Sequence, residues 1–107
     1  MKTIQREFNK HGYSYTLVTR IGDIAIYSQE KESHRNFEVM VIRKRKSDND
    51  FAGTKAGDEY MPSPEEWGIY GWTLTTYEEA IIDFFKFQQE QFSSNVGELK
   101  QMELQFN

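Results

Sequence analysis

Both prolines and both tryptophans of the 107-residue chain stand within residues 62–72, and this stretch constrains the fold more than any other. A proline fixes its own φ and keeps the residue before it extended, so the chain cannot be helical until after Pro64. Ser63, Pro64 and the two acids that follow then predict a single helical turn with a serine cap. We expect residues 58–75, here called the proline-tryptophan connection, to act as a rigid scaffold.

Upstream of the connection, the apolar side chains recur with a period of two. Residues 13–20 alternate apolar and polar side chains, residues 24–30 read as the returning strand, and residues 37–43 are apolar on both faces. The last of these segments should be the best-covered strand of the sheet. Residues 13–46 therefore predict a three-stranded antiparallel meander, and residues 72–74 add a short edge strand.

Downstream of the connection, the pattern changes to that of a helix. Thr76 followed by Glu79 matches a capping box. Apolar side chains recur at spacings of three and four through residues 76–92, so one stripe of this helix should cover the sheet. Ile82 and Phe85 fall outside the stripe and either pack under the connection or are left for a partner.

The two ends of the chain are less strongly patterned. The spacing of four between Ile4 and Phe8 suggests that residues 1–10 form a short helix, although a frayed N-terminal arm fits nearly as well. Residues 93–97 are expected to end the long helix. Residues 93–107 form the tail, in which the apolar positions of residues 98–107 fit either a helix or a strand.

These segments together predict one α+β domain over residues 1–107. A three- to four-stranded antiparallel meander carries one C-terminal helix across one face. With 37% hydrophobic and 15% aromatic residues, large rings must supply much of the core. No run approaches the roughly 20 apolar residues of a membrane span, and the N-terminus lacks the apolar segment of a signal peptide, so we expect a cytosolic protein.

Several kinds of chemistry find little support in the sequence. The chain has no cysteine and only two histidines, so we expect neither a metal nor a cofactor. Acids such as Glu65 are explained by the dipole of the helical turn, and no nucleophile elbow or phosphate-binding glycine pattern occurs. The chain is therefore expected not to be an enzyme, unless a cleft brings Glu59 or Glu66 to His34. Trp67 and Trp72 lining an open cavity with converging polar groups would also overturn that expectation.

Charge is distributed unevenly along the chain. Residues 1–55 hold eleven Lys/Arg and seven Asp/Glu, a net charge of +4, whereas residues 56–107 hold two and ten, a net charge of −8. This split fits a surface for a charged partner, or two faces that attract each other within the fold. The densest basic cluster is a candidate nucleic-acid site and consists of Arg43, Lys44, Arg45 and Lys46. A charged strand end that blocks edge pairing is the alternative explanation.

The acidic half of the chain offers a candidate surface for binding a protein. Glu79, Asp83 and Glu90 are separated by four and seven residues, which places three carboxylates along one side of the helix. Large aromatic side chains are typical of protein interfaces. We therefore take Trp67 and Tyr70, together with the three acids, as the candidate partner-binding residues.

The chain also resembles a type of short protein encoded in phage and prophage genomes. The resemblance covers residues 8–87 and is carried by three spaced groups of residues, which are Gly22-x-x-Ala25-x-Tyr27, Phe37-Glu38-Val39 and Glu59-Tyr60-x-Pro62-Ser63-x-x-x-Trp67-Gly68-x-x-Gly71-Trp72-Thr73. It implies a small accessory protein that binds a host or defence-system protein, acting as an inhibitor by occupying a surface. Nucleic-acid binding through residues 43–46 is the alternative function.

Overall fold

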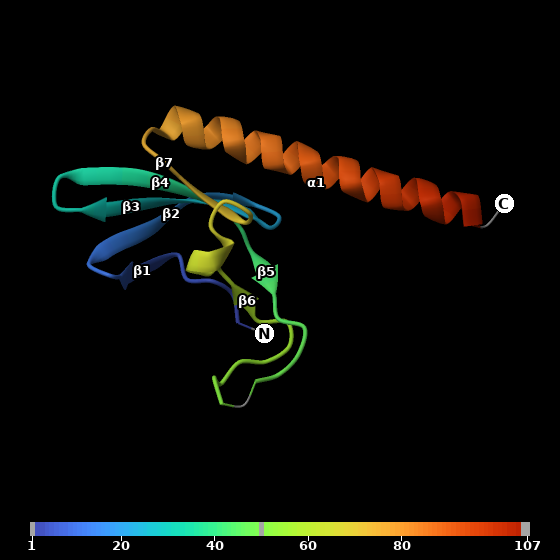
Figure 1. Ribbon diagram of the computed structural model, residues 1–107, viewed down its shortest axis with the longest axis horizontal. Helices are drawn as coiled ribbons and strands as arrows, with labels where there is room; N and C mark the ends of the chain where they lie inside the picture. Colours follow the sequence, from blue (N-terminus) through green and yellow to red (C-terminus); the bar gives the residue numbers. More distant parts are fainter. Residues whose placement is uncertain (1, 50, 106–107) are drawn as a thin grey trace.

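A computed structural model describes residues 2–49 and 51–105 of the chain. Its centre is a five-stranded antiparallel sheet in the order β1-β2-β3-β4-β7 (Figure 1). The strands are β1 (Glu7–Lys10), β2 (Tyr13–Ile21), β3 (Ile24–Lys31), β4 (His34–Val41) and β7 (Gly71–Leu74). Outside this sheet lie the short pair β5 (Arg43–Lys44) and β6 (Glu59–Tyr60), the 3-10 turn η1 (Pro64–Glu66) and the helix α1 (Tyr77–Gln105). The predicted α+β class, with a C-terminal helix packed against an antiparallel sheet, is confirmed.

Each face of the sheet has its own apolar cluster, because successive side chains of a strand point to opposite faces. On one face, Ile24 and Ile26 of β3 pack with Val39 and with Ala80 and Phe84 of α1. On the other face, Tyr27 packs with a buried set completed by Tyr15, Ala25, Met40 and Ile42. Figure 1 shows α1 on one side of the sheet and η1 with β6 on the other. The sheet is therefore covered on both faces.

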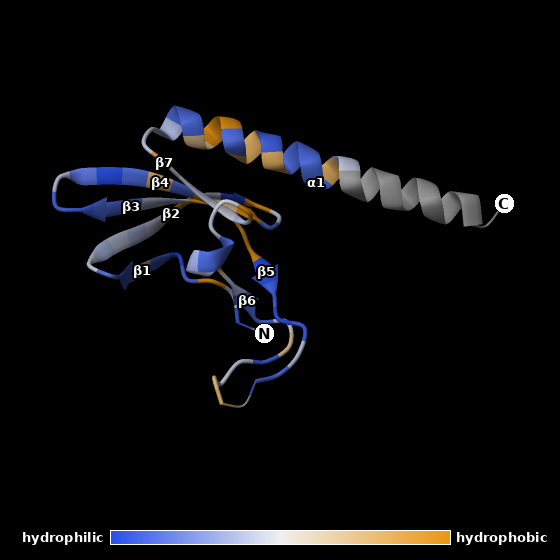
Figure 2. Cartoon of the chain, in the orientation of Figure 1, coloured by the Kyte–Doolittle hydropathy of each residue, from blue (hydrophilic) through white to orange (hydrophobic). Residues whose placement is uncertain are grey.

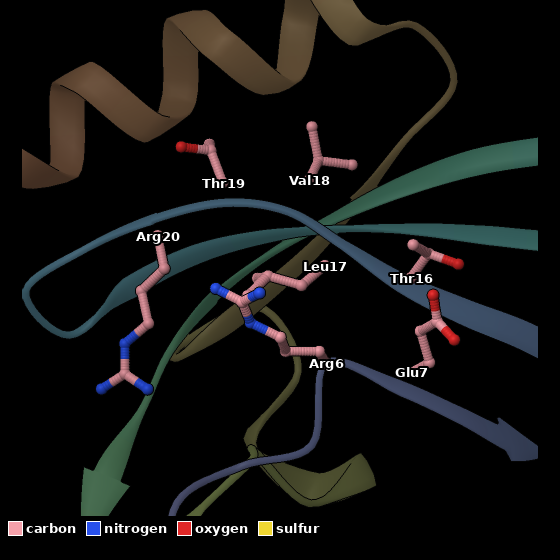
Figure 3. Close-up of a pocket in the computed structure, with 7 residues that line it drawn as sticks. All are labelled: Arg6, Glu7, Thr16, Leu17, Val18, Thr19 and Arg20. Atoms are coloured by element: carbon pink, nitrogen blue, oxygen red, sulfur yellow. The ribbon is translucent and has the colours of Figure 1, made fainter.

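A β-bulge in β2 changes the direction of its side chains. Leu17 pairs with Tyr27 and Thr19 pairs with Ile26, so that Val18 is the extra residue. Figure 3 shows the consequence, with Val18 and Thr19 both on the helix side of the strand and Leu17 on the opposite side. The hollow beside the bulge, about 350 Å³, is lined partly by Arg6 and Arg20.

Two sequence expectations about the ends of the chain are wrong. Residues 7–10 form strand β1 and not a helix, because Phe8 stacks on Tyr15 of β2 with ring centroids 4.6 Å apart. The helix does not end at residues 93–97 but continues to Gln105. Its first half shows alternating apolar and polar bands in Figure 2, and Figure 1 shows its C-terminal end extending beyond the sheet.

The proline-tryptophan connection is ordered by short-range hydrogen bonds. The backbone N–H of Ser63 donates to Glu66 Oε1 at 3.0 Å, which confirms the predicted capped turn η1. The indole Nε1–H of Trp67 donates to Thr73 Oγ1 at 3.0 Å. A Cβ atom at Gly71 would lie only 2.5 Å from the Trp67 ring, so only glycine lets this ring pack so closely on β7. Thr76 Oγ1 accepts from the N–H of Glu79 at 3.2 Å, as predicted for the start of α1.

Candidate functional site

An apolar groove runs between α1 and the proline-tryptophan connection, and we call it the helix groove. It has a volume of about 340 Å³ and apolar walls from Ile24, Val41, Ile69, Trp72 and Phe87. Trp72 and Phe87 stack with ring centroids 4.2 Å apart, which joins β7 to the helix. Ile69, at the tip of the connection, is 64% exposed, an unusually large fraction for an isoleucine beside other apolar side chains. The polar lining comes from Tyr70, Glu90 and Gln91.

The helix groove brings together two of the five candidate partner-binding residues, Tyr70 and Glu90. Because an α-helix turns by about 100° per residue, Glu79 and Asp83 lie on the same side of α1 as Glu90. Glu79 and Glu90 are exposed, and Asp83 is half-buried. The predicted row of acids is therefore one edge of α1, and it meets the groove at Glu90.

Trp67 is separated from the other candidates by the sheet itself. It packs against the cluster that contains Tyr15 and Met40, on the face away from α1. The expectation that Trp67 is an exposed aromatic of the same surface as Tyr70 is therefore wrong, because the connection wraps around the β7 edge between these two residues.

On that second face, Trp67 lines an open pocket with converging polar groups, which we call the Glu38 pocket. Its volume is about 370 Å³, and its lining consists of Lys10, His11, Tyr15, Glu38, Pro62, Pro64 and Trp67. Trp72 does not belong to this lining but lines the helix groove, so the two tryptophans do not share one cavity.

Glu38 is the most unusual side chain in the pocket, since it is a carboxylate that is only 7% exposed. Burial raises the pKa of Glu38 to about 7, against the opposing effects of the Lys10 charge and of a hydrogen bond from Tyr15. The Tyr15 hydroxyl in turn accepts a hydrogen bond from Gln29 Nε2 at 2.8 Å. Burial, followed by the charge of Glu38, also raises the pKa of Tyr15.

A signal for Glu38 was present in the sequence. Residues of β4 that are two apart share a face, so Glu38 lies in line with Met40 and with Ile42 just after the strand, and both of these side chains are buried in one cluster. Burying a single acid in an apolar row of a central strand costs free energy, so an acid at this position indicates a specific role.

The predicted nucleic-acid-binding residues fall into two groups. Arg43 is half-buried, pairs with Glu66 and lies over the rings of Tyr60 and Tyr70, 4.9 and 3.9 Å from their centroids. Arg45 also lies over Tyr60, 4.8 Å from its centroid. Lys44, Arg45 and Lys46 are exposed. Arg43 is therefore part of the packing of the connection, whereas the other three residues are accessible to a phosphate backbone.

The acids considered for catalysis are held by other groups. Glu59 binds Arg20 with two hydrogen bonds of 2.7 and 2.6 Å, and this bonding lowers the pKa of Glu59. Asp58 accepts the backbone N–H groups of Lys55 and Lys2, which lower the pKa of Asp58.

The cleft that would join Glu59 or Glu66 to His34 is not formed. Glu66 accepts the backbone N–H of Ser63 and pairs with Arg43, and these two contacts lower the pKa of Glu66. His34 pairs with Lys31 at the far end of the β3-β4 hairpin.

Among the side chains that the structure describes, which are those of residues 2–49 and 51–93, no group of three or more histidine or acidic residues is placed to share a metal ion. Within residues 2–49 and 51–105, no helix combines the length and apolar character that crossing a membrane requires. Comparison with protein-family models, with curated proteins and with solved structures finds no match to this chain.

Proposed function

We propose that the chain is a non-enzymatic binding module that recognises a protein through the helix groove and the acidic edge of α1. The observation that carries this proposal is the helix groove itself, where an exposed isoleucine and a stacked aromatic pair adjoin the Glu90 carboxylate. An apolar pocket beside a charged rim is the usual anatomy of a protein interface.

The chemistry of the partner follows from the two parts of this surface. The groove accepts an apolar or aromatic side chain, and the carboxylates of Glu79, Asp83 and Glu90 attract lysines or arginines flanking it. The preferred partner is therefore a basic segment of a protein with one large apolar anchor. The resemblance to short phage proteins supports a host or defence-system protein in the host cytosol as the partner. The chain inhibits that partner by occupying the partner's surface.

A capture experiment with matched variants tests the proposal. The full chain, Ile69→Asp and Glu90→Lys serve as baits in host lysate, with Glu78→Lys as the control. Glu78 is also exposed on α1, but it points away from the acidic edge because residues 78 and 79 differ by about 100° around the helix. A partner identified with the wild-type chain should lose at least about tenfold in affinity with both groove variants and keep its affinity with the control. A captured protein that binds all four baits equally would contradict the proposal.

Nucleic-acid binding remains the second candidate, and the exposure of Lys44, Arg45 and Lys46 favours it. A gel shift with random DNA and RNA at increasing salt would show steep salt dependence if these residues bind phosphates. The test should use Lys44→Glu with Lys46→Glu, since Arg43 has a structural contact to Glu66. Binding that survives this double substitution would rule out the basic cluster.

A further inference from the structure

The Glu38 carboxylate is buried without the partner that a buried charge normally has. Among the residues that the structure describes, none forms a salt bridge with Glu38: the Lys10 charge acts on the carboxylate from a longer distance, and Tyr15 supplies a hydrogen bond but no charge. Removing an ionised carboxylate from water is costly unless a cation and hydrogen bonds replace the water. The other buried acids on this face differ, because Glu59 has Arg20 and Asp58 has two backbone N–H groups.

The surroundings of Glu38 are aromatic and rigid. Tyr15 is held by its stack on Phe8, and Trp67 is held by Thr73 and by its close packing on Gly71. Beside the open pocket lies a narrower recess of about 40 Å³ that is also lined by Glu38 and Trp67. This recess is larger than the roughly 10–15 Å³ that one water molecule needs, so a small polar head group can reach the carboxylate.

We propose that the Glu38 pocket binds the guanidinium or ammonium head of an organic cation, with the Glu38 carboxylate as its ion-pair partner and the Trp67 and Tyr15 rings as its walls. A carboxylate combined with aromatic rings is the arrangement that suits such cations. A hard metal ion would need several oxygen ligands, and the pocket lining has a single carboxylate. An anion would be repelled by Glu38. The site lies on the opposite face of the sheet from the helix groove and does not depend on the function proposed above.

The ionisation of Glu38 gives this proposal a second readout. Because burial raises the pKa of Glu38 to about 7, the carboxyl group is only partly ionised at neutral pH, and a bound cation favours the ionised form. The other titratable or charged groups that line the pocket are Lys10 of β1, His11 of the β1-β2 turn and Tyr15 of β2. Affinity for a cation should therefore rise about tenfold between pH 6 and pH 8, with release of a proton on binding.

The test uses the full chain and two probes, which are methylguanidinium and a short end-capped peptide whose only charged group is one central arginine. Binding is followed by the NMR resonance of the Trp67 indole N–H, with the Trp72 indole as an internal reference. We expect a saturable shift of the Trp67 resonance and the pH dependence given above. If both probes bind equally, the ligand is a small cation. If the peptide binds tighter, and loses this affinity when citrulline replaces arginine, the ligand is a protein side chain.

Two substitutions separate ion pairing from a general effect on the fold. Glu38→Gln should abolish the Trp67 shift and its pH dependence. Lys10→Gln, measured at about pH 9 so that Glu38 is ionised in both chains, should strengthen binding by removing a competing positive charge. Absence of a saturable shift with either probe in the unmodified chain would overturn the proposal, whether or not the variants fold. Binding that persists in Glu38→Gln, or that weakens in Lys10→Gln, would overturn it as well.

Discussion

Glu38 gives the stability of the protein a pH dependence that can be predicted at the scale of one residue. Its pKa in the folded chain is about 7, above its usual value of 4.5, so the folded state holds a proton that the unfolded chain has already lost. The contribution of Glu38 to the unfolding free energy should therefore be largest below pH 4.5 and should fall as the pH rises through 7.

Between pH 5 and pH 8 we expect the wild-type chain to lose on the order of 2–3 kcal/mol of unfolding free energy because of Glu38. Urea denaturation at several pH values measures this loss, and Glu38→Gln should remove it. The pKa values of Asp58, Glu59 and Glu66 are lowered, so these groups affect stability only at more acidic pH, outside the measured window. A Glu38→Gln variant with the same slope as the wild type would contradict this assignment.

Arg43 and Lys44 are adjacent cations with different roles, which mutation should separate. Arg43 pairs with Glu66 and lies over two tyrosine rings, whereas Lys44 is exposed. We expect Arg43→Gln to cost about 1–3 kcal/mol, and Lys44→Gln to change stability by less than about 0.5 kcal/mol. Chemical denaturation of the two variants at one pH provides the measurement. Equal losses would mean that Arg43 contributes no more than a surface charge.

At the scale of elements, the helix α1 has one buried and one exposed face, and the adjacent residues Phe84 and Phe85 lie on different faces. Phe84 is 1% exposed and packs on the sheet, whereas Phe85 is 59% exposed. Phe84→Ala should destabilise the chain by about 3–5 kcal/mol, but Phe85→Ala should cost less than about 1 kcal/mol. Thermal melts followed by circular dichroism distinguish these outcomes. A large loss in Phe85→Ala would show that its ring is covered in solution, for example by a second copy of the chain.

Gly71 joins the connection to β7, and its lack of a side chain is a specific requirement. An alanine Cβ would meet the Trp67 ring at 2.5 Å, and this ring is also held by Thr73. Gly71→Ala should therefore cost about 1–3 kcal/mol and displace Trp67. Tryptophan fluorescence should change together with stability, whereas Gly53→Ala, at a loop position with no neighbour within 4 Å, should leave the fluorescence unchanged.

Local patterns predicted the elements whose partners are close in sequence. The alternation in residues 13–20 and 24–30, the capped turn after Ser63 and the start of α1 at Thr76 are all found in the structure. β1 was missed although its partner β2 follows directly, because the spacing of four between Ile4 and Phe8 suits a helix and Phe8 is the only apolar residue of the strand. The end of α1 was placed too early, because serine and glycine lower helix propensity without preventing a helix from continuing.

The candidate site was only partly predictable, since it depends on long-range packing. Spacing placed Glu79, Asp83 and Glu90 on one edge of α1, but the meeting of Glu90 with Tyr70 requires the connection to fold back onto the helix. Likewise, the burial of Glu38 depends on Trp67 and Pro62 arriving from a distant part of the chain. The assignment of Arg43 to phosphate binding overlooked Glu66, because the pair forms only after the turn η1 is in place.

At the scale of the whole molecule, α1 is longer than the sheet that it covers. At about 1.5 Å per residue, a helix of 29 residues is about 43 Å long, whereas the 8 residues of β3 span about 27 Å. The side chains described in the apolar cluster with the sheet come from the first half of α1 and include Ala80, Phe84 and Phe87. A chain that stops after Ser93 should therefore keep its melting temperature within about 4 °C. A larger drop would show that the projecting turns contribute to the fold.

The proline-tryptophan connection borders the Glu38 pocket with Trp67 and the helix groove with Ile69 and Tyr70. Trp67 is already held by Thr73 and by its packing on Gly71, so a ligand in the Glu38 pocket takes little further conformational freedom from Ile69 and Tyr70. Filling one site should therefore leave the affinity of the other unchanged, although a single segment of the chain borders both. By thermodynamic reciprocity, the same independence holds in the other direction.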